Sequence, residues 1–258
     1  MYAKRKSALH CAFALHKNAT LVAMFKPFNQ FAKRLLLPNS CALCEAPVSV
    51  DIALCDACAK ELPRNENCCA LCALPLGVAT ACCGRCMRKR LLINRILAPF
   101  QYAHPIDSLV LRFKKRGDLA TGALLAAMFS QEFDAQKRAM TLGELPQALV
   151  PVPLHDARLR VRGFDQARLL AQALGKTAAR PVLTSLLRTR DTGSQGGLSA
   201  TARVRNVAGA FAASGFNGVQ HVALIDDVAT TAATLNACAL ALKRAGVKRV
   251  DAWVIARA

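Results

Sequence analysis

The 258-residue chain combines 12 cysteines with a formal net charge of +19, and it is long enough for one large domain and a smaller one. Its first residues lack an uninterrupted apolar region with a cleavage site, which argues against secretion and therefore against disulfides. No stretch approaches the roughly 18 uncharged apolar residues of a membrane span. We therefore expect a cytoplasmic protein that binds metal through cysteine and a polyanion, such as nucleic acid, through its cations. Arginines on a solvated surface would explain the same charge without a partner.

Residues 1–34 are predicted to form a basic arm, because lysines and arginines recur there and the first acid is Glu45. Phe25, Phe28 and Phe31 recur at helical spacing, so an amphipathic helix in the second half of the arm could pack on the body. A mitochondrial-type presequence is the alternative. We rank it lower, because the arm runs without a break into a cysteine-rich module.

That module, predicted over residues 35–90, contains the same cysteine spacing twice, with a period of 28 residues. In each repeat, two C-x-x-C pairs are separated by ten residues. Two such pairs supply the four thiolates of a tetrahedral structural zinc, so the pattern predicts a double zinc ribbon. The assignment of one zinc to each repeat rests only on the adjacency of the cysteine pairs. A crossed arrangement, in which each zinc takes cysteines from both repeats, is consistent with the same sequence, and so is zinc at only one of the two sites. Redox chemistry is disfavoured, because no thioredoxin-like βαβ context surrounds the pairs. The predicted ligands are Cys41, Cys44, Cys55, Cys58, Cys69, Cys72, Cys83 and Cys86.

The large domain is predicted over residues 91–258. A strand-like run lies within 91–102, and apolar residues recur at helical spacing over Ile106–Phe113. The motif FKKRGD, Phe113–Asp118, then places three cations and a glycine before a predicted helix at Leu119–Phe129. Cations at such a position can hold a pyrophosphate, and a solvated turn is the alternative.

A short strand is predicted at 148–152, and an arginine-rich segment follows it. Arg158, Arg160 and Arg162 precede Gly163. A guanidinium fork matches phosphate geometry and a glycine lets the backbone approach, so we expect these residues to contact phosphate or nucleic acid. Phe164 is expected to anchor this segment in the core rather than to stack on a base.

The stretch HVALIDDVATTAAT, residues 221–234, indicates a strand, a loop and the start of a helix. His221–Ile225 is apolar and β-branched, and Asp226 and Asp227 are expected to end the strand. A helix at Leu235–Arg244 and a strand at Val250–Ala256 complete a βαβ unit. Such strands run parallel, with the ligand crevice at their carboxyl ends.

Threonines at the start of that helix favour an anion. Thr230, Thr231 and Thr234 add hydroxyl donors where unpaired backbone N–H groups and the helix dipole already attract phosphate. A ribose would separate the phosphate from the two acids, because its hydroxyls can bond to the carboxylates. The segment therefore predicts a sugar phosphate site, and simple helix capping is the alternative.

Taken together, the motifs resemble those of the ComF family, over about residues 35–258. They are the four C-x-x-C pairs, FKKRGD, VPVPLHDARLRVRGFDQA, the Gln195–Asn206 stretch and LIDDVATTAAT. The resemblance implies an α/β fold, namely a type I phosphoribosyltransferase domain with a parallel twisted sheet flanked by helices, joined to a small double zinc ribbon. It also implies a loop that binds phosphoribosyl pyrophosphate, made of Asp226, Asp227, Thr230, Thr231, Ala232, Ala233 and Thr234. The implied pyrophosphate loop, with bridging Mg²⁺, is Lys114, Lys115, Arg116 and Gly117.

Two positions depart from the family pattern. Ala232 stands where glycine is usual, and a positive φ there would cost about 1 kcal/mol or more. Asp165 stands where asparagine is common, which removes an amide donor and adds a negative charge beside the arginines.

Three functions are consistent with the resemblance. The family implies a role in natural competence, handling single-stranded DNA beside a helicase-like partner. Phosphoribosyl transfer to an unidentified acceptor in nucleotide metabolism is the second, and a regulator that senses the ligand without chemistry is the third. The sequence names no general base, because His104, His155 and His221 lack a recognisable partner.

Overall fold

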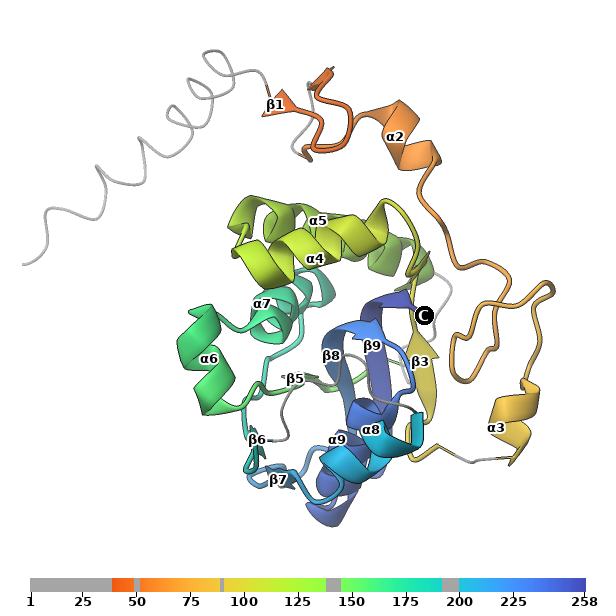
Figure 1. Ribbon diagram of the computed structural model, residues 1–258. Coiled ribbons are helices and arrows are strands. Elements are labelled where there is room, and N and C mark those ends of the chain that lie inside the picture. The colour runs from red at the N-terminus through yellow and green to blue at the C-terminus, as the bar shows by residue number, and fades with distance from the viewer. Residues whose placement is uncertain (1–38, 49–51, 89–90, 138–144, 192–199) are drawn as a thin grey trace, which may run out of the picture.

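The computed structural model describes residues 39–48, 52–88, 91–137, 145–191 and 200–258 (Figure 1). The predicted basic arm at 1–34 lies outside these residues, as does the 195–199 part of the Gln195–Asn206 stretch.

A parallel sheet forms the centre of the molecule. Its strand order is β3, β9, β8, β5, and β4 also pairs with β9. The strands are β3 (Arg95–Leu97), β4 (Phe100–Gln101), β5 (Ala148–Pro151), β8 (His221–Ala229) and β9 (Arg249–Arg257). Helices flank the sheet, so the predicted α/β class with a parallel sheet is confirmed (Figure 1).

Helices cover both faces of the sheet. Side chains alternate along β8: Ala223 and Ile225 join one buried cluster, and Val222 and Leu224 join the other. The first cluster lies under α4 (Ile106–Arg116), α5 (Leu119–Lys137) and α7 (Gln166–Ala178); α8 (Ala200–Val207) and α9 (Ala233–Arg244) cover the second. None of the described helices is long and apolar enough to cross a membrane.

The predicted βαβ unit is present as β8, α9 and β9, with the two strands parallel. Its first strand is longer than expected, because β8 continues to Ala229. Asp226 and Asp227 therefore lie inside the strand rather than after it. Pairing with β9 explains the extension, since Ala229 is in register with Arg257.

The FKKRGD motif is not a loop before a helix. Lys114, Lys115 and Arg116 form the last turn of α4, which ends at Gly117 with a φ of 65°. Cations are favoured in a last turn by the helix dipole, and glycine adopts this left-handed conformation without strain. Asp118 then accepts hydrogen bonds from the Thr121 amide (3.0 Å) and hydroxyl (2.6 Å), so it caps α5.

Two shorter segments border the carboxyl end of β5. Helix α6 (Asp156–Arg162) follows that strand directly. Strands β6 (Leu186–Arg188) and β7 (Phe211–Ala213) form a separate antiparallel pair.

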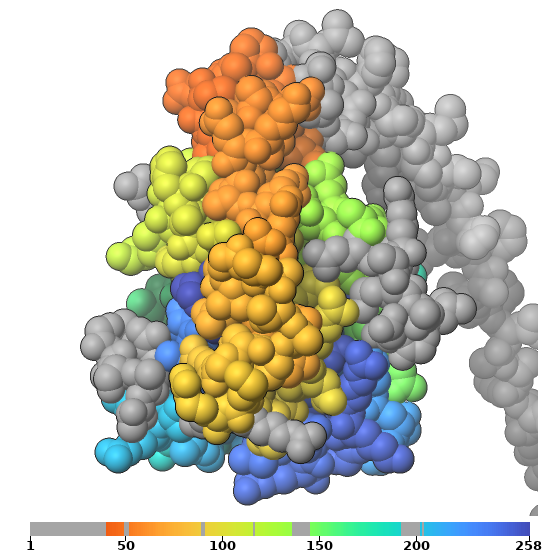
Figure 2. All heavy atoms as spheres, turned by 90° about the vertical axis from the view of Figure 1, so that its right-hand side faces the viewer, coloured from red at the N-terminus to blue at the C-terminus, as the bar shows by residue number. Residues whose placement is uncertain are grey.

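The two cysteine repeats occupy different places on this body. The first contains β1 (Asn39–Ser40), β2 (Pro47–Val48) and α2 (Asp56–Lys60), and it packs against the cluster under α4 and α5. The second contains α3 (Gly84–Arg88) and lies along the β3 edge, where Ile96 N–H donates to Leu71 O at 2.8 Å. Figure 2 shows the second repeat covering this side of the molecule below the first. The edge strand is thereby protected from pairing with another chain.

Candidate functional site

A cavity of about 450 Å³ opens at the carboxyl ends of β5 and β8. Segments that are far apart in the sequence converge on it, namely the end of α4, helix α6, the acid pair and the start of α9. The predicted site residues that line it are Lys114, Arg158, Arg162, Asp226, Asp227, Thr230, Thr231, Ala232, Ala233 and Thr234.

The other predicted phosphate contacts do not line this cavity. Lys115 and Arg160 are exposed, and Gly163 is the C-cap of α6 with a φ of 79°. Gly117 caps α4, and the Arg116 side chain lies outside the described part of the structure. Helical spacing explains the split on α6, because Arg158 and Arg162 are one turn apart and share a face that Arg160 does not.

The two adjacent acids point to opposite faces of β8, as successive residues of a strand must. Asp227 lies on the α4 side, and its carboxylate forms an ion pair of 2.7 Å with Lys114 Nζ. Burial lowers the pKa of Lys114, but the Asp227 and Asp226 carboxylates outweigh that effect and the net pKa is raised. The end of α4 is thus anchored at the cavity as a cation.

Asp226 is the more perturbed acid. Burial and the neighbouring Asp227 charge raise the pKa of Asp226 to about 8. Burial also raises the pKa of Asp165, which lines the cavity. Because Asp226 is largely protonated at neutral pH, the lining carries less negative charge than its three acids suggest, which favours an anionic ligand.

Besides Asp165, the polar lining residues that the sequence does not predict as site residues are Tyr102, Gln166 and Arg188. Gln166 is 4% exposed and accepts a hydrogen bond of 2.6 Å from Arg162 Nη1. Its Nε2 has no hydrogen-bond partner among the described residues. A buried amide donor that lacks a partner fits a ligand oxygen. Gln166 belongs to a motif that the sequence does show, RGFDQA, whereas no local pattern marks Arg188 or Tyr102.

Helix α9 begins at this cavity. It starts at Ala233 after Ala232, whose φ of 58° and ψ of 15° are left-handed. Thr231 Oγ1 accepts a hydrogen bond of 3.4 Å from the Ala233 amide. The N-terminal amides and the positive end of the helix dipole make this turn suitable for a phosphate. The expected cost at Ala232 is therefore present, because only glycine adopts this conformation freely.

The second departure from the family pattern has a structural role. Asp165 is the N-cap of α7, and its carboxylate accepts a hydrogen bond of 3.0 Å from the Arg168 amide. An asparagine oxygen would accept the same bond, so the cap itself does not require the charge. The ring of Phe164 packs on Phe113 with centroids 5.3 Å apart, which agrees with the anchoring role expected for it.

The eight paired cysteines form two groups of four, one from each repeat. Within each group the Sγ atoms lie within 4.8 Å of one another. The Cys44–Cys55 and Cys72–Cys83 sulfur distances are 3.6 and 3.7 Å, close to the roughly 3.8 Å edge of a tetrahedron with Zn–S bonds of about 2.3 Å. Both groups therefore fit structural zinc, and the crossed arrangement is excluded. The groups are Cys41, Cys44, Cys55, Cys58 and Cys69, Cys72, Cys83, Cys86.

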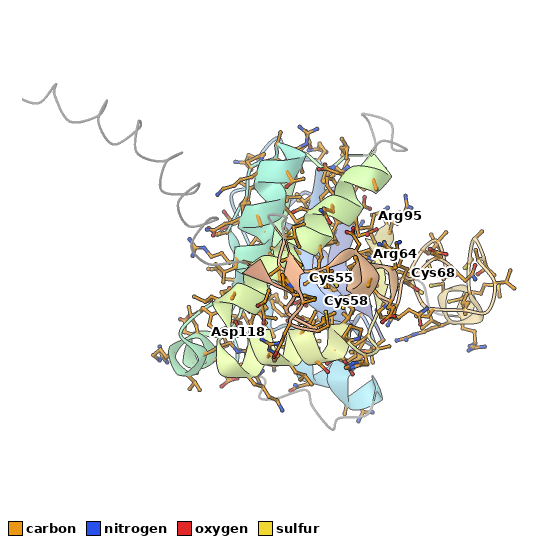
Figure 3. All side chains as sticks on the ribbon, turned by 90° about the horizontal axis from the view of Figure 1, so that it is seen from above. Cys55, Cys58, Arg64, Cys68, Arg95 and Asp118 are labelled. Atoms are coloured by element: carbon orange, nitrogen blue, oxygen red, sulfur yellow. The ribbon has the colours of Figure 1, made fainter. Side chains whose placement is uncertain are left out.

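Hydrogen bonds from backbone amides help to lower the pKa of one thiol in each group. Burial raises the pKa of Cys41, but hydrogen bonds from the backbone of Cys55 and Cys44 outweigh it and lower the pKa to about 6. Burial likewise raises the pKa of Cys83, but hydrogen bonds from the Cys86 backbone and from the neighbouring cysteine side chains together outweigh it and lower the pKa to about 7. Zinc binds the thiolate, so these amides favour the ligand form. Seen from above, Cys55 and Cys58 lie over the helical layer, and Cys68, outside both groups, lies beside Arg64 and Arg95 (Figure 3).

The described histidines are not at the cavity. His221 Nε2 is 2.9 Å from Asp251 Oδ2, at the opposite end of β8 from the acid pair, so the expectation that His221 has no partner is wrong. His155 is the N-cap of α6 and accepts a hydrogen bond from the Ala157 amide at 3.3 Å. None of the described histidines lines the cavity.

Comparisons with known proteins agree with these features. A family model described as a double zinc ribbon domain matches residues 32–87. Competence protein F of Haemophilus influenzae is 36% identical over 161 residues, which cover 61% of this chain and 70% of that protein. The DNA utilization protein YhgH of Salmonella typhimurium is 33% identical over 227 residues, or 86% of this chain and 99% of that protein. Competence protein ComFC of Streptococcus pneumoniae is 28% identical over 160 residues, covering 62% and 67%. With two repeats that each gather four cysteines, and with relatives above 30% identity over most of their length, the chain belongs to the ComF family.

Proposed function

We propose that this protein binds phosphoribosyl pyrophosphate, or a closely similar sugar phosphate, and that it acts in the uptake and use of DNA. The observation that carries the first part is a single cavity that contains the acid pair, the start of α9 and several cations. The second part is supported by relatives that are named competence and DNA utilization proteins.

The acid pair and the loop after it suit the ribose 5-phosphate half of the ligand. Asp226 and Asp227 both line the cavity, from opposite faces of β8, and would offer carboxyl oxygens to ribose hydroxyls. The Thr230–Thr234 loop offers backbone amides at the start of α9 to the 5-phosphate. The helix dipole stabilises an anion at this helix end. The 5-phosphate would therefore bind the loop, while the ribose hydroxyls bind the acid pair.

The cations suit the pyrophosphate half. Lys114, Arg158, Arg162 and Arg188 line the same cavity. Guanidinium groups bind phosphate oxygens through paired hydrogen bonds, and the half-buried Lys114, held by Asp227, adds a fixed charge. Mg²⁺ prefers carboxylate and phosphate oxygens, so Asp226 and Asp227 would hold it together with the ligand and it would neutralise pyrophosphate charge.

Single-stranded DNA binding is the second component of this proposal. It would use exposed cations and the basic arm at 1–34, beside the ribbons at 35–90 and the large domain at 91–258, with a helicase-like protein as partner. The net charge of +19 supports it, because neutralising backbone phosphates provides most of non-specific DNA affinity. The cytoplasm suits this role, because its reducing conditions keep the zinc ligands as thiols.

Transfer of the phosphoribosyl group to an acceptor would need a base that activates the acceptor. None of the described histidines lines the cavity, and the candidate base among the lining residues is Asp226, whose pKa of about 8 suits proton transfer near neutral pH. Phosphoribosyl transfer to an unidentified acceptor is therefore the second candidate, and a regulator that senses the ligand without chemistry is the third.

Isothermal titration of the full chain with phosphoribosyl pyrophosphate, with and without Mg²⁺, tests the proposal. The Arg158→Ala, Arg162→Ala double variant should bind the ligand at least tenfold more weakly, because each arginine provides charge-assisted hydrogen bonds. Arg160→Ala removes one charge from the same helix outside the cavity, so it is the control for the Arg158→Ala and Arg162→Ala single variants, each of which should bind more weakly than it does. Wild-type protein that binds no ligand would refute the cavity assignment. A salt-dependent gel shift with single-stranded DNA tests the second component separately.

A further inference from the structure

The loop that lines the proposed phosphate site has a second cavity behind it. This cavity, of about 600 Å³, is lined by parts of the second cysteine repeat, α8 and α9. Thr231, Ala232 and Ala233 line both cavities. The loop is therefore a thin wall, with the acid pair on one side and the second repeat on the other.

Arg257 links the second repeat to this wall. It is 1% exposed and stands at the end of β9. Its Nε donates to Cys72 O at 2.9 Å, and its Nη1 donates to Ala229 O at 2.8 Å and also to Thr230 O. One buried guanidinium thus bonds both to a backbone carbonyl of a predicted zinc ligand and to two carbonyls at the start of the loop.

Arg85 makes the next link. It lies on α3 between the predicted zinc ligands Cys83 and Cys86, and its Nη2 donates to Thr231 O at 2.8 Å. Arg85 and Arg257 both line the second cavity and neither lines the first.

The carbonyls of three consecutive residues, 229 to 231, are thereby bonded to Arg257 or Arg85, and Ala229 O also accepts from the Ala258 amide at 3.0 Å. In a planar trans peptide the carbonyl and the following N–H point in opposite directions. The amides of Thr230, Thr231 and Ala232 are consequently directed away from these two cations, and all three residues line the first cavity. A cation on each carbonyl also polarises its peptide, which makes the amide a stronger donor to an anion.

We propose that Arg85 and Arg257 are positioning residues for the phosphate-binding loop, and that the second cysteine group sets phosphate affinity through them. This inference rests on the proposed function. The first group differs, because it packs on α4 and α5, and no residue of the first repeat is among the described residues that line either cavity.

The test uses the full chain, ribose 5-phosphate as the probe of the loop, and elemental analysis for zinc. Arg85→Ala should weaken ribose 5-phosphate binding about tenfold or more and leave the zinc content unchanged. Arg88→Ala, on the same helix, is the matched control, because it removes the same charge from an exposed position that lines neither cavity. Arg85 is exposed, so its variant should fold even where an Arg257 variant does not.

A second pair of variants separates the two metal groups. Cys86→Ser should lose one zinc together with ribose 5-phosphate affinity, whereas Cys44→Ser should lose one zinc and keep that affinity. Equal binding by the Arg85→Ala and Arg88→Ala proteins, or equal loss in the two cysteine variants, would overturn the inference. Wild-type protein that does not bind ribose 5-phosphate would instead refute the proposed function on which the inference depends.

Discussion

Lys114 at the end of α4 and Asp227 in β8 form an ion pair of 2.7 Å that joins the helical layer to the sheet at the mouth of the cavity. The side chain of Asp227 is 7% exposed and that of Lys114 is 29% exposed, so water screens the pair poorly. The pair therefore holds two candidate ligand-binding residues in place before any ligand arrives.

Replacing Lys114 by methionine should destabilise the protein by on the order of 3 kcal/mol, because it leaves the buried Asp227 carboxylate without its cation. Denaturant unfolding followed by circular dichroism measures this. The Lys114→Met, Asp227→Asn double variant should recover much of the loss, since no unpaired charge then remains. A single variant as stable as the wild type would show that solvent already satisfies Asp227.

The raised pKa of Asp226 predicts a pH dependence of stability. Its value of about 8 in the folded protein exceeds the ordinary value near 4, so the folded state binds more protons between these limits. The contribution of Asp226 to the free energy of unfolding is fully present below about pH 4 and is lost as the pH rises through about 8. The unfolding midpoint should fall more steeply over this range in the wild type than in Asp226→Asn. The exposed Asp134→Asn is the control, and parallel curves for the wild type and Asp226→Asn would contradict the assignment.

The Asp226→Asn, Asp227→Asn double variant should separate ligand binding from DNA binding. It should lose Mg²⁺-dependent binding of phosphoribosyl pyrophosphate, because it removes the charged acceptor Asp227, whose hydrogen bonds contribute about 1.5 to 3 kcal/mol each, and both carboxylates that would bind Mg²⁺. Single-stranded DNA binding should persist or improve slightly, since the acids oppose a polyanion. Titration calorimetry and a gel shift at two salt concentrations measure the two activities. Unchanged ligand affinity would mean that the ribose lies elsewhere.

Ala232→Gly should tighten binding of phosphoribosyl pyrophosphate. The φ of 58° is costly for alanine, by about 1 kcal/mol, and the methyl group stands where phosphate must approach the backbone. Because Ala232 has this φ without any ligand, its cost should appear as a gain of about 1 kcal/mol in the free energy of unfolding of Ala232→Gly, and the gain in affinity comes from removing the methyl group. Ala233→Gly, one residue further and inside α9, is the control and should bring no gain. Equal effects of the two substitutions would show that loop entropy, and not the methyl group of Ala232, controls affinity.

Protein purified without chelator should contain about two zinc ions per chain, because each repeat gathers a complete set of four thiols. Elemental analysis measures this, and the absence of zinc would contradict it. Cys69→Ser should destabilise the body more than Cys44→Ser, because Cys69 is buried in the same cluster as the sheet residues and Cys44 is exposed.

Local patterns predicted most of this architecture. The βαβ unit could be read from apolar runs around the acid pair, and the zinc groups from cysteine spacing alone. Apolar spacing predicts that α4 ends at Phe113, before its observed end at Arg116, because the triplet at 114–116 is polar. The glycine that follows a basic last turn is a signal for a helix end that could have corrected it.

Contacts between distant segments could not be predicted in this way. Arg188 reaches the cavity from a short antiparallel pair, and Tyr102 from the loop before α4. Neither position has a local pattern, because the sheet topology alone brings them to the carboxyl ends of β5 and β8. Arg160 is the opposite case. Its position between Arg158 and Arg162 in the sequence predicts a phosphate contact, but helical geometry directs it away from the cavity.

The bonds from Arg257 to Cys72 and Ala229 also constrain how this protein can evolve. A ribbon exchanged for that of another protein would have to offer the same carbonyl to the same buried guanidinium. Recombination between residues 86 and 91 would separate Arg85 from the loop carbonyl that it contacts. The second repeat and the loop are thus expected to be inherited together, whereas the first repeat can diverge or be replaced with fewer consequences for the cavity.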